Sequence, residues 1–253
     1  MAEQKQEFKF PTEEIELPSE GKVYSKDSPL SSGKIDIKYM TAKEEDILTS
    51  QNLIKKGTVI DKLLNSLIVT NGVNVDDLVL GDKNAVMVAS RILAYGEDYE
   101  CEIINPNTGN KITHTLDLSN CDFKKLPEGI NGNYFETTLP VSKVKIGYKL
   151  LTGKEERAID AELKSVNKLG TQVSPELTTR LRYLITSVNG DDSKQIISNF
   201  VENMLSKDSL YFRQEVTKVS PDIELEQEIE MEGDTVKVDI PMTVNFFWPN
   251  TGS

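Results

Sequence analysis

A strand pattern followed at once by a helix start is the feature that most constrains the fold of this chain. Ile35, Ile37 and Tyr39 alternate with polar residues, which is the period of a half-buried strand. Thr41 and Glu44 follow with the spacing of a capping box, in which each side chain binds an amide left free at the start of a helix. This segment therefore predicts a strand that leads directly into a helix.

The same pattern returns in the second half of the chain. Val144, Ile146 and Tyr148 alternate as the first strand does, and Thr152 and Glu155 repeat the capping-box spacing. Helical patterns and a terminal hairpin pattern follow each copy. We therefore predict an α+β fold of helical clusters, each joined to a small antiparallel hairpin or sheet. Internal duplication explains the repeat; the alternative is a common local pattern that occurs twice by coincidence.

Composition and periodicity divide the chain into four segments. They are an N-terminal arm (1–32), a strand, helix cluster and hairpin unit (33–120), a linker (121–133), and a second such unit with an aromatic C-terminal tail (134–253). Pro127, Gly129 and Gly132 interrupt any periodicity in the linker. Helices are expected over 42–56, over 58–70, from an N-cap at Asp82 to Gly96, and over 153–169, 175–189, 193–205 and 207–219.

The first unit ends in a hairpin predicted over 99–104 and 111–118, which places Cys101 opposite His114. Two ligands do not complete a four-coordinate zinc site. A half-buried cross-strand pair accounts for the same spacing, so we expect no metal and no other cofactor. Cys101 and Cys121 are the only cysteines, and we expect both to be reduced thiols.

Charge and motif content argue against several functions. The formal net charge of -12 repels phosphates, so no nucleic-acid partner is expected. The sequence has no apolar run of about 18 residues and no apolar region of a signal peptide, which predicts a cytoplasmic chain without membrane insertion. One histidine and the absence of common catalytic motifs predict that the protein is not an enzyme. The enzymatic alternative is a hydrolase with two converging carboxylates.

An acidic ladder extends from residue 222 to residue 234, where every second residue is Asp or Glu. Apolar residues occupy most of the other positions, and only a strand places the two kinds on opposite faces. A Gly233-Asp234 loop predicts a tight hairpin. Its opposite pairs would be Met231 and Val236, Ile229 and Val238, Leu225 and Met242, and Glu228 and Asp239. The acidic face is then either solvated or in contact with a basic partner.

The chain ends in an aromatic cluster that contains its single tryptophan. Burial of each ring contributes about 2–3 kcal/mol, so the rings are expected to dock. They dock either on the core of this chain or in a pocket of another protein, where tryptophan is a frequent anchor. The candidate interface residues are Leu17, Pro18, Glu224, Glu226, Glu228, Glu230, Phe246, Phe247, Trp248 and Pro249.

An ordered set of short motifs carries a family resemblance. The motifs are Leu17-Pro-Ser-Glu-Gly-Lys-Val-Tyr24, Ile35-Asp-Ile-Lys-Tyr-Met-Thr-Ala-Lys-Glu-Glu45, Arg91-Ile-Leu-Ala-Tyr-Gly96, Leu116-Asp-Leu118, Phe135-Glu-Thr-Thr-Leu-Pro140 and Phe246-Phe-Trp-Pro249. In this order they resemble the baseplate hub subunit family of T-even-type contractile-tailed bacteriophages. Some members of that family have a C-P-x-C-type turn in the first hairpin that would bind zinc. Asn105-Pro106-Asn107-Thr108 holds that place here, so the metal site is not carried over.

The resemblance implies a non-enzymatic structural or assembly component of the tail baseplate hub. Such a protein would be made in the host cytoplasm, would be located in the virion baseplate, and would contact other hub and tail proteins. The alternative is a transient assembly chaperone that binds a hub protein and is absent from the mature virion. The resemblance leaves the bound hub protein and the oligomeric state open.

Overall fold

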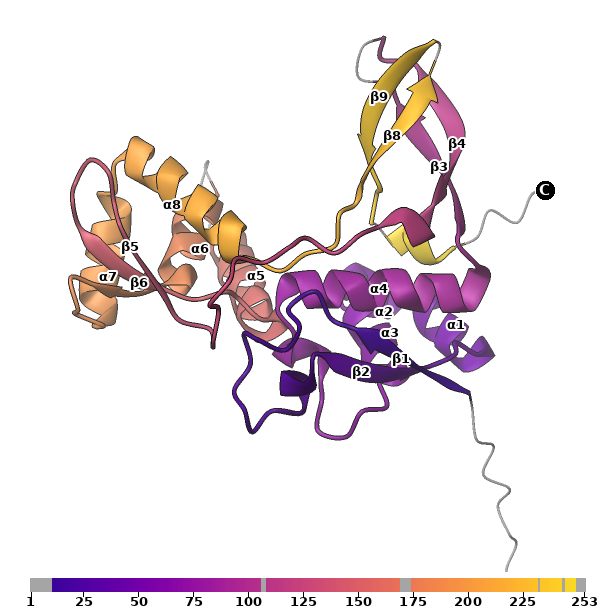
Figure 1. Cartoon of the computed structure of the whole chain (residues 1–253), viewed down its shortest axis with the longest axis horizontal. Coiled ribbons are helices and arrows are strands. Elements are labelled where there is room, and N and C mark those ends of the chain that lie inside the picture. Colours follow the sequence, from indigo (N-terminus) through magenta and orange to yellow (C-terminus); the bar gives the residue numbers. More distant parts are fainter. Residues whose placement is uncertain (1–10, 106–107, 169–173, 232, 243, 249–253) are drawn as a thin grey trace, which may run out of the picture.

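The computed structural model describes residues 11–105, 108–168, 174–231, 233–242 and 244–248. Figure 1 shows two bodies of helices and small sheets, with a pair of hairpins standing on one of them. The described residues form eight α-helices and four antiparallel sheets of two or three strands. The predicted α+β class is confirmed.

The first body, which we name the first lobe, contains residues 11–120 and 221–248. Its sheet pairs β1 (Thr12–Glu16) with β2 (Lys34–Lys38), which buries Ile35 and Ile37 as the alternation predicts. Its helices are α1 (Ala42–Thr49), α2 (Gln51–Lys56), α3 (Val59–Leu67) and α4 (Leu80–Tyr95). Its hairpins are β3 (Asp98–Ile104) with β4 (Lys111–Asp117), and β8 (Glu226–Met231) with β9 (Asp234–Asp239).

Two helix boundaries in the first lobe differ from the prediction. The helix expected over 42–56 is interrupted at Ser50, whose ψ of 101° is extended, so this residue ends α1 and precedes α2. The next long helix begins at Leu80, and Asp82 lies in its first turn instead of capping it. The Asp82 carboxylate has other partners, because it accepts hydrogen bonds from Ser19 N at 2.9 Å and from Tyr24 Oη at 2.5 Å.

The second lobe contains residues 133–219 and has a three-stranded sheet in the order β5 (Phe135–Thr138), β6 (Lys145–Tyr148) and β7 (Ile185–Val188). Its helices are α5 (Gly153–Lys168), α6 (Glu176–Leu184), α7 (Lys194–Glu202) and α8 (Ser206–Val219). The helix predicted over 175–189 ends at Leu184. Residues 185–188 are rich in β-branched side chains and pair with β6 instead.

Short 3-10 helices complete the described elements: η1 (Pro29–Ser32), η2 (Val75–Asp77), η3 (Leu118–Asn120) and η4 (Val244–Phe247). Each lobe has its own hydrophobic core. Ile146, Tyr148 and Phe212 are central to the second core. The first core includes Phe246 and Phe247 from the C-terminal segment. The described residues between 221 and 248, which the sequence grouped with the second unit, therefore pack on the first lobe.

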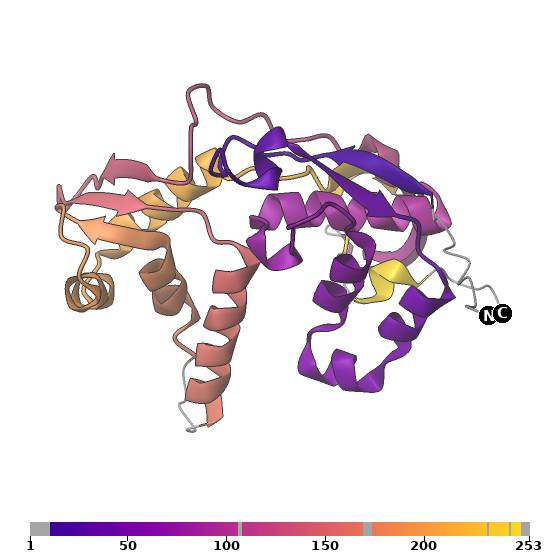
Figure 2. The same ribbon diagram turned by 90° about the horizontal axis from the view of Figure 1, so that it is seen from below.

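Close backbone contacts join the two lobes, which lie side by side in Figure 2. Val79 forms a single antiparallel β-bridge with Thr152. Gly153 N donates a hydrogen bond to Leu78 O at 3.0 Å. A Cβ atom on Gly153 would come within 2.9 Å of Val75 O, so a larger residue would push α5 away from η2. The lobes are thus packed together through the main chain.

Candidate functional site

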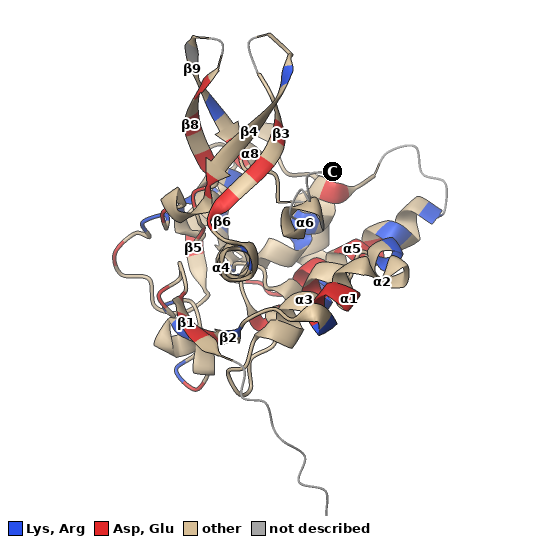
Figure 3. Ribbon diagram, turned by 90° about the vertical axis from the view of Figure 1, so that its right-hand side faces the viewer, with Lys and Arg blue, Asp and Glu red and all other residues tan. Residues whose placement is uncertain are grey.

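The two hairpins of the first lobe form a projection that we name the hairpin arm, defined as residues 98–117 and 226–239 (Figures 1 and 3). Apolar side chains alternate along the strands and are buried between the hairpins, as expected for strands with one covered face. These buried residues are Tyr99, Cys101, Ile103, Leu116, Ile229, Met231, Val236 and Val238. They belong to the first core, so the arm is a folded extension of that core.

The first hairpin has the predicted pairing, with Cys101 directly opposite His114. Burial raises the pKa of the Cys101 thiol. The raised pKa keeps the thiol protonated at neutral pH. In the part of the chain that the structure describes, no group of three or more His, Cys, Asp or Glu side chains could hold a metal ion.

The predicted register of the second hairpin is wrong by two residues. Ile229 pairs with Val236, and Glu228 pairs with Lys237 instead of Asp239. The cause is the position of the turn, because β9 already begins at Asp234. Gly233 lies in the turn with a φ of 93°, a conformation that glycine adopts without strain. The outer face therefore carries opposite charges beside each other.

Lys237 is central to that outer face. Its Nζ lies 2.7 Å from a Glu226 carboxylate oxygen and 3.8 Å from a Glu228 carboxylate oxygen. The hydrogen bond to Glu226 raises the pKa of Lys237. The pair of like charges in this hairpin is Glu226 opposite Asp239. The side chains of Glu224, Glu226, Glu228 and Glu230 are exposed, and their role in an interface stays a prediction.

The aromatic tail divides into a buried part and an exposed part. Phe246 and Phe247 are each 0% exposed, and their ring centroids lie 5.5 Å apart. Tyr99 packs its ring 5.0 Å from Phe246, and Arg91 Nε donates a hydrogen bond to Phe246 O at 3.0 Å. The two phenylalanines therefore dock on the core of this chain. Trp248 is 37% exposed. Pro249 lies outside the described residues.

The predicted interface residues Leu17 and Pro18 are buried in the first lobe. Their backbone turn is fixed by the Asp82 carboxylate, which accepts hydrogen bonds from Ser19 N and Tyr24 Oη. Burial raises the pKa of Asp82, although both hydrogen bonds favour its ionised form. The sequence pattern predicted Asp82 only as an N-cap. Its partners lie 63 and 58 residues earlier in the chain, so no local signal indicates these contacts.

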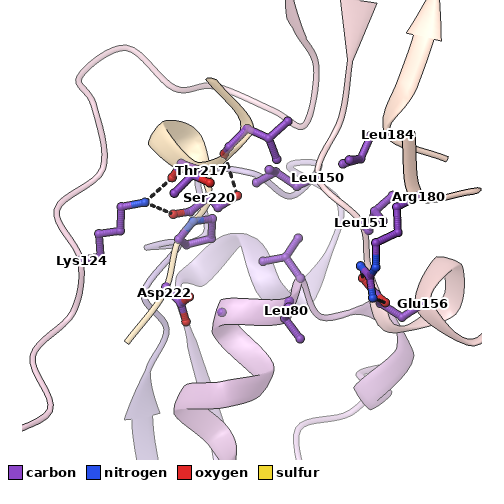
Figure 4. A pocket seen from close by; sticks show the side chains of 14 residues that line it. Leu80, Lys124, Leu150, Leu151, Glu156, Arg180, Leu184, Thr217, Ser220 and Asp222 are labelled. Carbon is purple, nitrogen blue, oxygen red and sulfur yellow. Dashed lines mark hydrogen bonds and ion pairs between the residues drawn. The ribbon is translucent and has the colours of Figure 1, made fainter. Parts of the chain in front are cut away.

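A hollow lies where the lobes meet, between the start of α4 and the end of α8 (Figure 4). Its volume is about 260 Å³. Leucine side chains form much of its wall: Leu80, Leu150, Leu151 and Leu184. Gly81 and Pro221 line the hollow and pack against each other so closely that a Cβ atom on Gly81 would overlap the proline carbonyl oxygen.

The charged groups around this hollow already have partners. Arg180 holds both carboxylate oxygens of Glu156, each at 2.8 Å. Lys124 donates hydrogen bonds to Thr217 O and to Ser220 O, the latter at 3.2 Å, and so satisfies carbonyls at the end of α8 (Figure 4). These contacts hold the linker against the end of α8 and α5 against α6. The hollow therefore lies where the two lobes pack together, and Lys124, Glu156 and Arg180 at its wall already form hydrogen bonds or ion pairs within the protein.

Within the described residues, no helix combines the length and the apolar character needed to cross a lipid bilayer.

The sequence model of a family described as T4 bacteriophage base plate protein matches residues 10–248 of the chain. The comparison with curated proteins and the comparison with solved structures gave no match. The family match includes both lobes, the linker and the hairpin arm.

Proposed function

Because this chain belongs to the family of T4 bacteriophage base plate proteins, we propose that it is a non-enzymatic component of the baseplate hub of a contractile-tailed phage. It would act through contacts with other hub and tail proteins. The family match over residues 10–248 is the observation that carries the proposal, because it covers nearly all of the described fold. In this proposal the chain is assembled in the host cytoplasm and becomes part of the virion.

The shape of the first lobe supports a role in protein contacts. The hairpin arm projects from the body and presents two outer faces to solvent (Figure 3). The exposed Ile104 and Trp248 provide apolar surface on or beside the arm. Glu102 and Asp239 share a surface hollow with Ile104, and Glu100 and Glu102 share one with Trp248. Such charges favour partners with complementary basic surfaces and disfavour others. This combination fits a protein that recognises neighbours in an assembly.

Two measurements test the proposal. Mass spectrometry of purified virions is expected to detect the chain, and co-purification from infected cells is expected to recover other baseplate proteins with it. Association with a hub protein in infected cells but absence from virions would favour the transient chaperone. Failure to associate with any baseplate protein, together with normal tails in a phage that lacks the gene, would contradict both forms of the proposal.

A further inference from the structure

The two hairpins of the arm are held together along one side. Glu224 N donates a hydrogen bond to Asp122 O at 2.7 Å. Gln227 Nε2 donates another to Asp117 O at 2.6 Å. These bonds join the segment before and within β8 to the segment that ends and follows β4. The β4 and β8 side of the arm is therefore closed by direct contacts.

The opposite side of the arm, between β3 and β9, is open. β3 has β4 as its single strand neighbour in the described sheets, and β9 has β8. The outer edges of β3 and β9 therefore present backbone groups that no described strand pairs with. Tyr99 Oη reaches across this side and donates a hydrogen bond to Pro241 O at 3.3 Å. That contact lies at the base of the arm and leaves the edges above it separate.

A groove follows this open side. Its upper hollow has a volume of about 290 Å³ and is lined by residues that include Ile104, Lys237 and Asp239. Its lower hollow has a volume of about 500 Å³ and is lined by residues that include Glu100 and Trp248. Both hollows share Glu102 and Pro241, so they form one continuous groove along the edge of β3.

Apolar side chains mark the two ends of the groove. Ile104 is 58% exposed at the upper end, and Trp248 is 37% exposed at the lower end. A strand rises about 3.3 Å per residue, so the four steps from Glu100 to Ile104 span about 13 Å. An extended segment of about five residues would reach from one apolar contact to the other.

The charge of the groove restricts what can enter it. Glu100, Glu102 and Asp239 line it, and Lys237 is the basic residue among its lining residues. Lys237 pairs with Glu226, and Glu102 pairs with Lys111 at 2.6 Å, so part of the charge is already balanced. Three carboxylates nevertheless stand against one lysine in the lining. The groove is therefore acidic, and a segment with lysine or arginine side chains complements it.

We propose that this groove binds an extended, basic segment of a partner protein, which adds as a strand to the free edge of β3. Backbone hydrogen bonds to β3 would provide affinity, as in other cases of strand addition. Alternate side chains of the segment would contact Trp248 and Ile104. Basic side chains of the segment would face Glu100 and Glu102. The identification of the partner as another baseplate protein rests on the proposed function.

Trp248 allows a direct test because it is the only tryptophan of the chain. Short tryptophan-free peptides are tiled along every baseplate protein of the same phage and added to the full chain. A binding peptide is expected to shift the emission of Trp248 to shorter wavelength and to protect it from acrylamide quenching. Hydrogen exchange of the same complex is expected to slow in β3, whereas the amides of β8 exchange as before.

Charge-reversal variants with a matched control test whether the carboxylates of the groove contribute to peptide binding. The double variant Glu100→Lys with Glu102→Lys is expected to weaken peptide binding at least about tenfold. The control is Glu224→Lys with Glu230→Lys, which changes the same number of exposed charges in and just before the other hairpin, at residues that do not line the groove. This control is expected to bind as the original chain does. Equal weakening by both variants would show a general charge effect and would overturn the assignment to the groove.

Other outcomes also overturn the proposal. If no peptide changes Trp248 emission, the groove takes no segment from these proteins, whether or not the chain still co-purifies with them. If Trp248 emission shifts with chain concentration alone and the mass doubles, the occupant is a second copy of the chain. The proposed function fails separately, through absence of association with baseplate proteins. The two failures are therefore distinguishable.

Discussion

Asp82 and Asp208 occupy matching places in the two lobes. Each is the third residue of a long helix, α4 in one case and α8 in the other. Each accepts hydrogen bonds from the backbone turn that follows a Leu-Pro pair after the first strand of its lobe. Each carboxylate is at most 1% exposed. These matched contacts support the proposed internal duplication.

The environments of the two carboxylates nevertheless shift their pKa values in opposite directions. Asp82 accepts from one backbone amide and one hydroxyl, and burial outweighs both, so its pKa is raised. Burial also acts on Asp208, but the amides of Val141 and Ser142, at 2.8 and 2.9 Å, outweigh it and lower the pKa. The Ser142 side chain and the positive charge of Lys143 add to the effect of the two amides at Asp208, whereas no positive charge acts on Asp82 among the causes of its shift. A repeated position can thus keep its geometry and change its electrostatics.

The capping boxes of the two lobes match as well. Glu44 accepts hydrogen bonds from Thr41 and pairs with Lys38 at 2.8 Å. Glu155 accepts hydrogen bonds from Thr152 and pairs with Lys149 at 2.5 Å. In both cases burial opposes ionisation, but the hydrogen bonds are stronger in sum and lower the pKa to about 2. Here the two lobes share both geometry and electrostatics.

The two cores differ in the origin of the aromatic rings that complete them. Phe212 of α8 completes the second core and packs its ring 5.2 Å from Tyr148. Phe246 completes the first core, although it comes from the far end of the chain. The first lobe therefore depends on a segment that is connected to it through the whole second lobe. This difference has direct consequences for stability.

The largest effect is expected for Phe246→Ala. Loss of the buried ring would leave a cavity beside Tyr99 and Phe247 and lower the free energy of unfolding by about 3–5 kcal/mol. Chemical denaturation measures the loss. Trp248→Ala is the control, because an exposed ring is expected to contribute less than about 1 kcal/mol.

Hydrogen exchange of Phe246→Ala then tests whether the lobes are independent. Faster exchange is expected in α3 and α4 of the first lobe, while α6 and α8 keep their protection. Uniform loss of protection would show that the two cores unfold as one unit. That result would contradict the prediction that each lobe unfolds independently of the other.

The next effect is expected for the matched pair Asp208→Asn and Asp82→Asn. An amide nitrogen at position 208 cannot accept from a backbone N–H, so Asp208→Asn is expected to cost about 2–3 kcal/mol of unfolding free energy. Asp82→Asn is expected to cost about 1 kcal/mol, since an amide can still accept from Ser19 N and donate to Tyr24 Oη. Thermal and urea unfolding at pH 7 compare them. Equal losses would contradict the assigned difference in their environments.

Acid titration of Glu44 is expected to have a somewhat smaller effect. Its pKa is lowered from 4.5 to about 2, so its stabilisation is complete above about pH 4.5 and is lost as the pH falls toward 2. Glu44→Gln is expected to cost about 2 kcal/mol at pH 7 and almost nothing near pH 2. Unfolding by urea across this pH range provides the measurement. Glu155→Gln is the matched variant, and a cost that does not fall with pH would contradict the argument.

The positions of several strands and helix starts could be predicted from the sequence because they depend on residues that are close together in the chain. The capping boxes and the alternating strands predicted where β2, β6, α1 and α5 lie. The register of β8 and β9 was missed because a shift of the pairing by two residues leaves every side chain on the same face of the hairpin, so the apolar pattern fits both registers. Docking of Phe246 on this chain's own core was one of the two alternatives, but the sequence did not specify the first lobe as its site, nor the pairing of Asp82 with Ser19. These contacts join residues far apart in the chain, and no local pattern specifies them.

The smallest effect is expected at the surface ion pairs of the two hairpins. Lys237 pairs with Glu226 at 2.7 Å, and Lys111 pairs with Glu102 at 2.6 Å, and all four side chains are at least half exposed. Exposed pairs contribute little because water and salt screen them. Lys237 differs, because it balances the charge of Glu226, whose cross-strand partner is the like-charged Asp239.

Lys237→Gln is therefore expected to lower the denaturation midpoint slightly at low salt, whereas Lys111→Gln leaves it unchanged. High salt screens the repulsion between Glu226 and Asp239, so the two variants are expected to have the same midpoint in 1 M salt, where the screening length is about 3 Å. Urea denaturation at low and high salt measures both. A salt-independent difference would mean that Lys237 acts through packing of its side chain on the hairpin instead of through its charge.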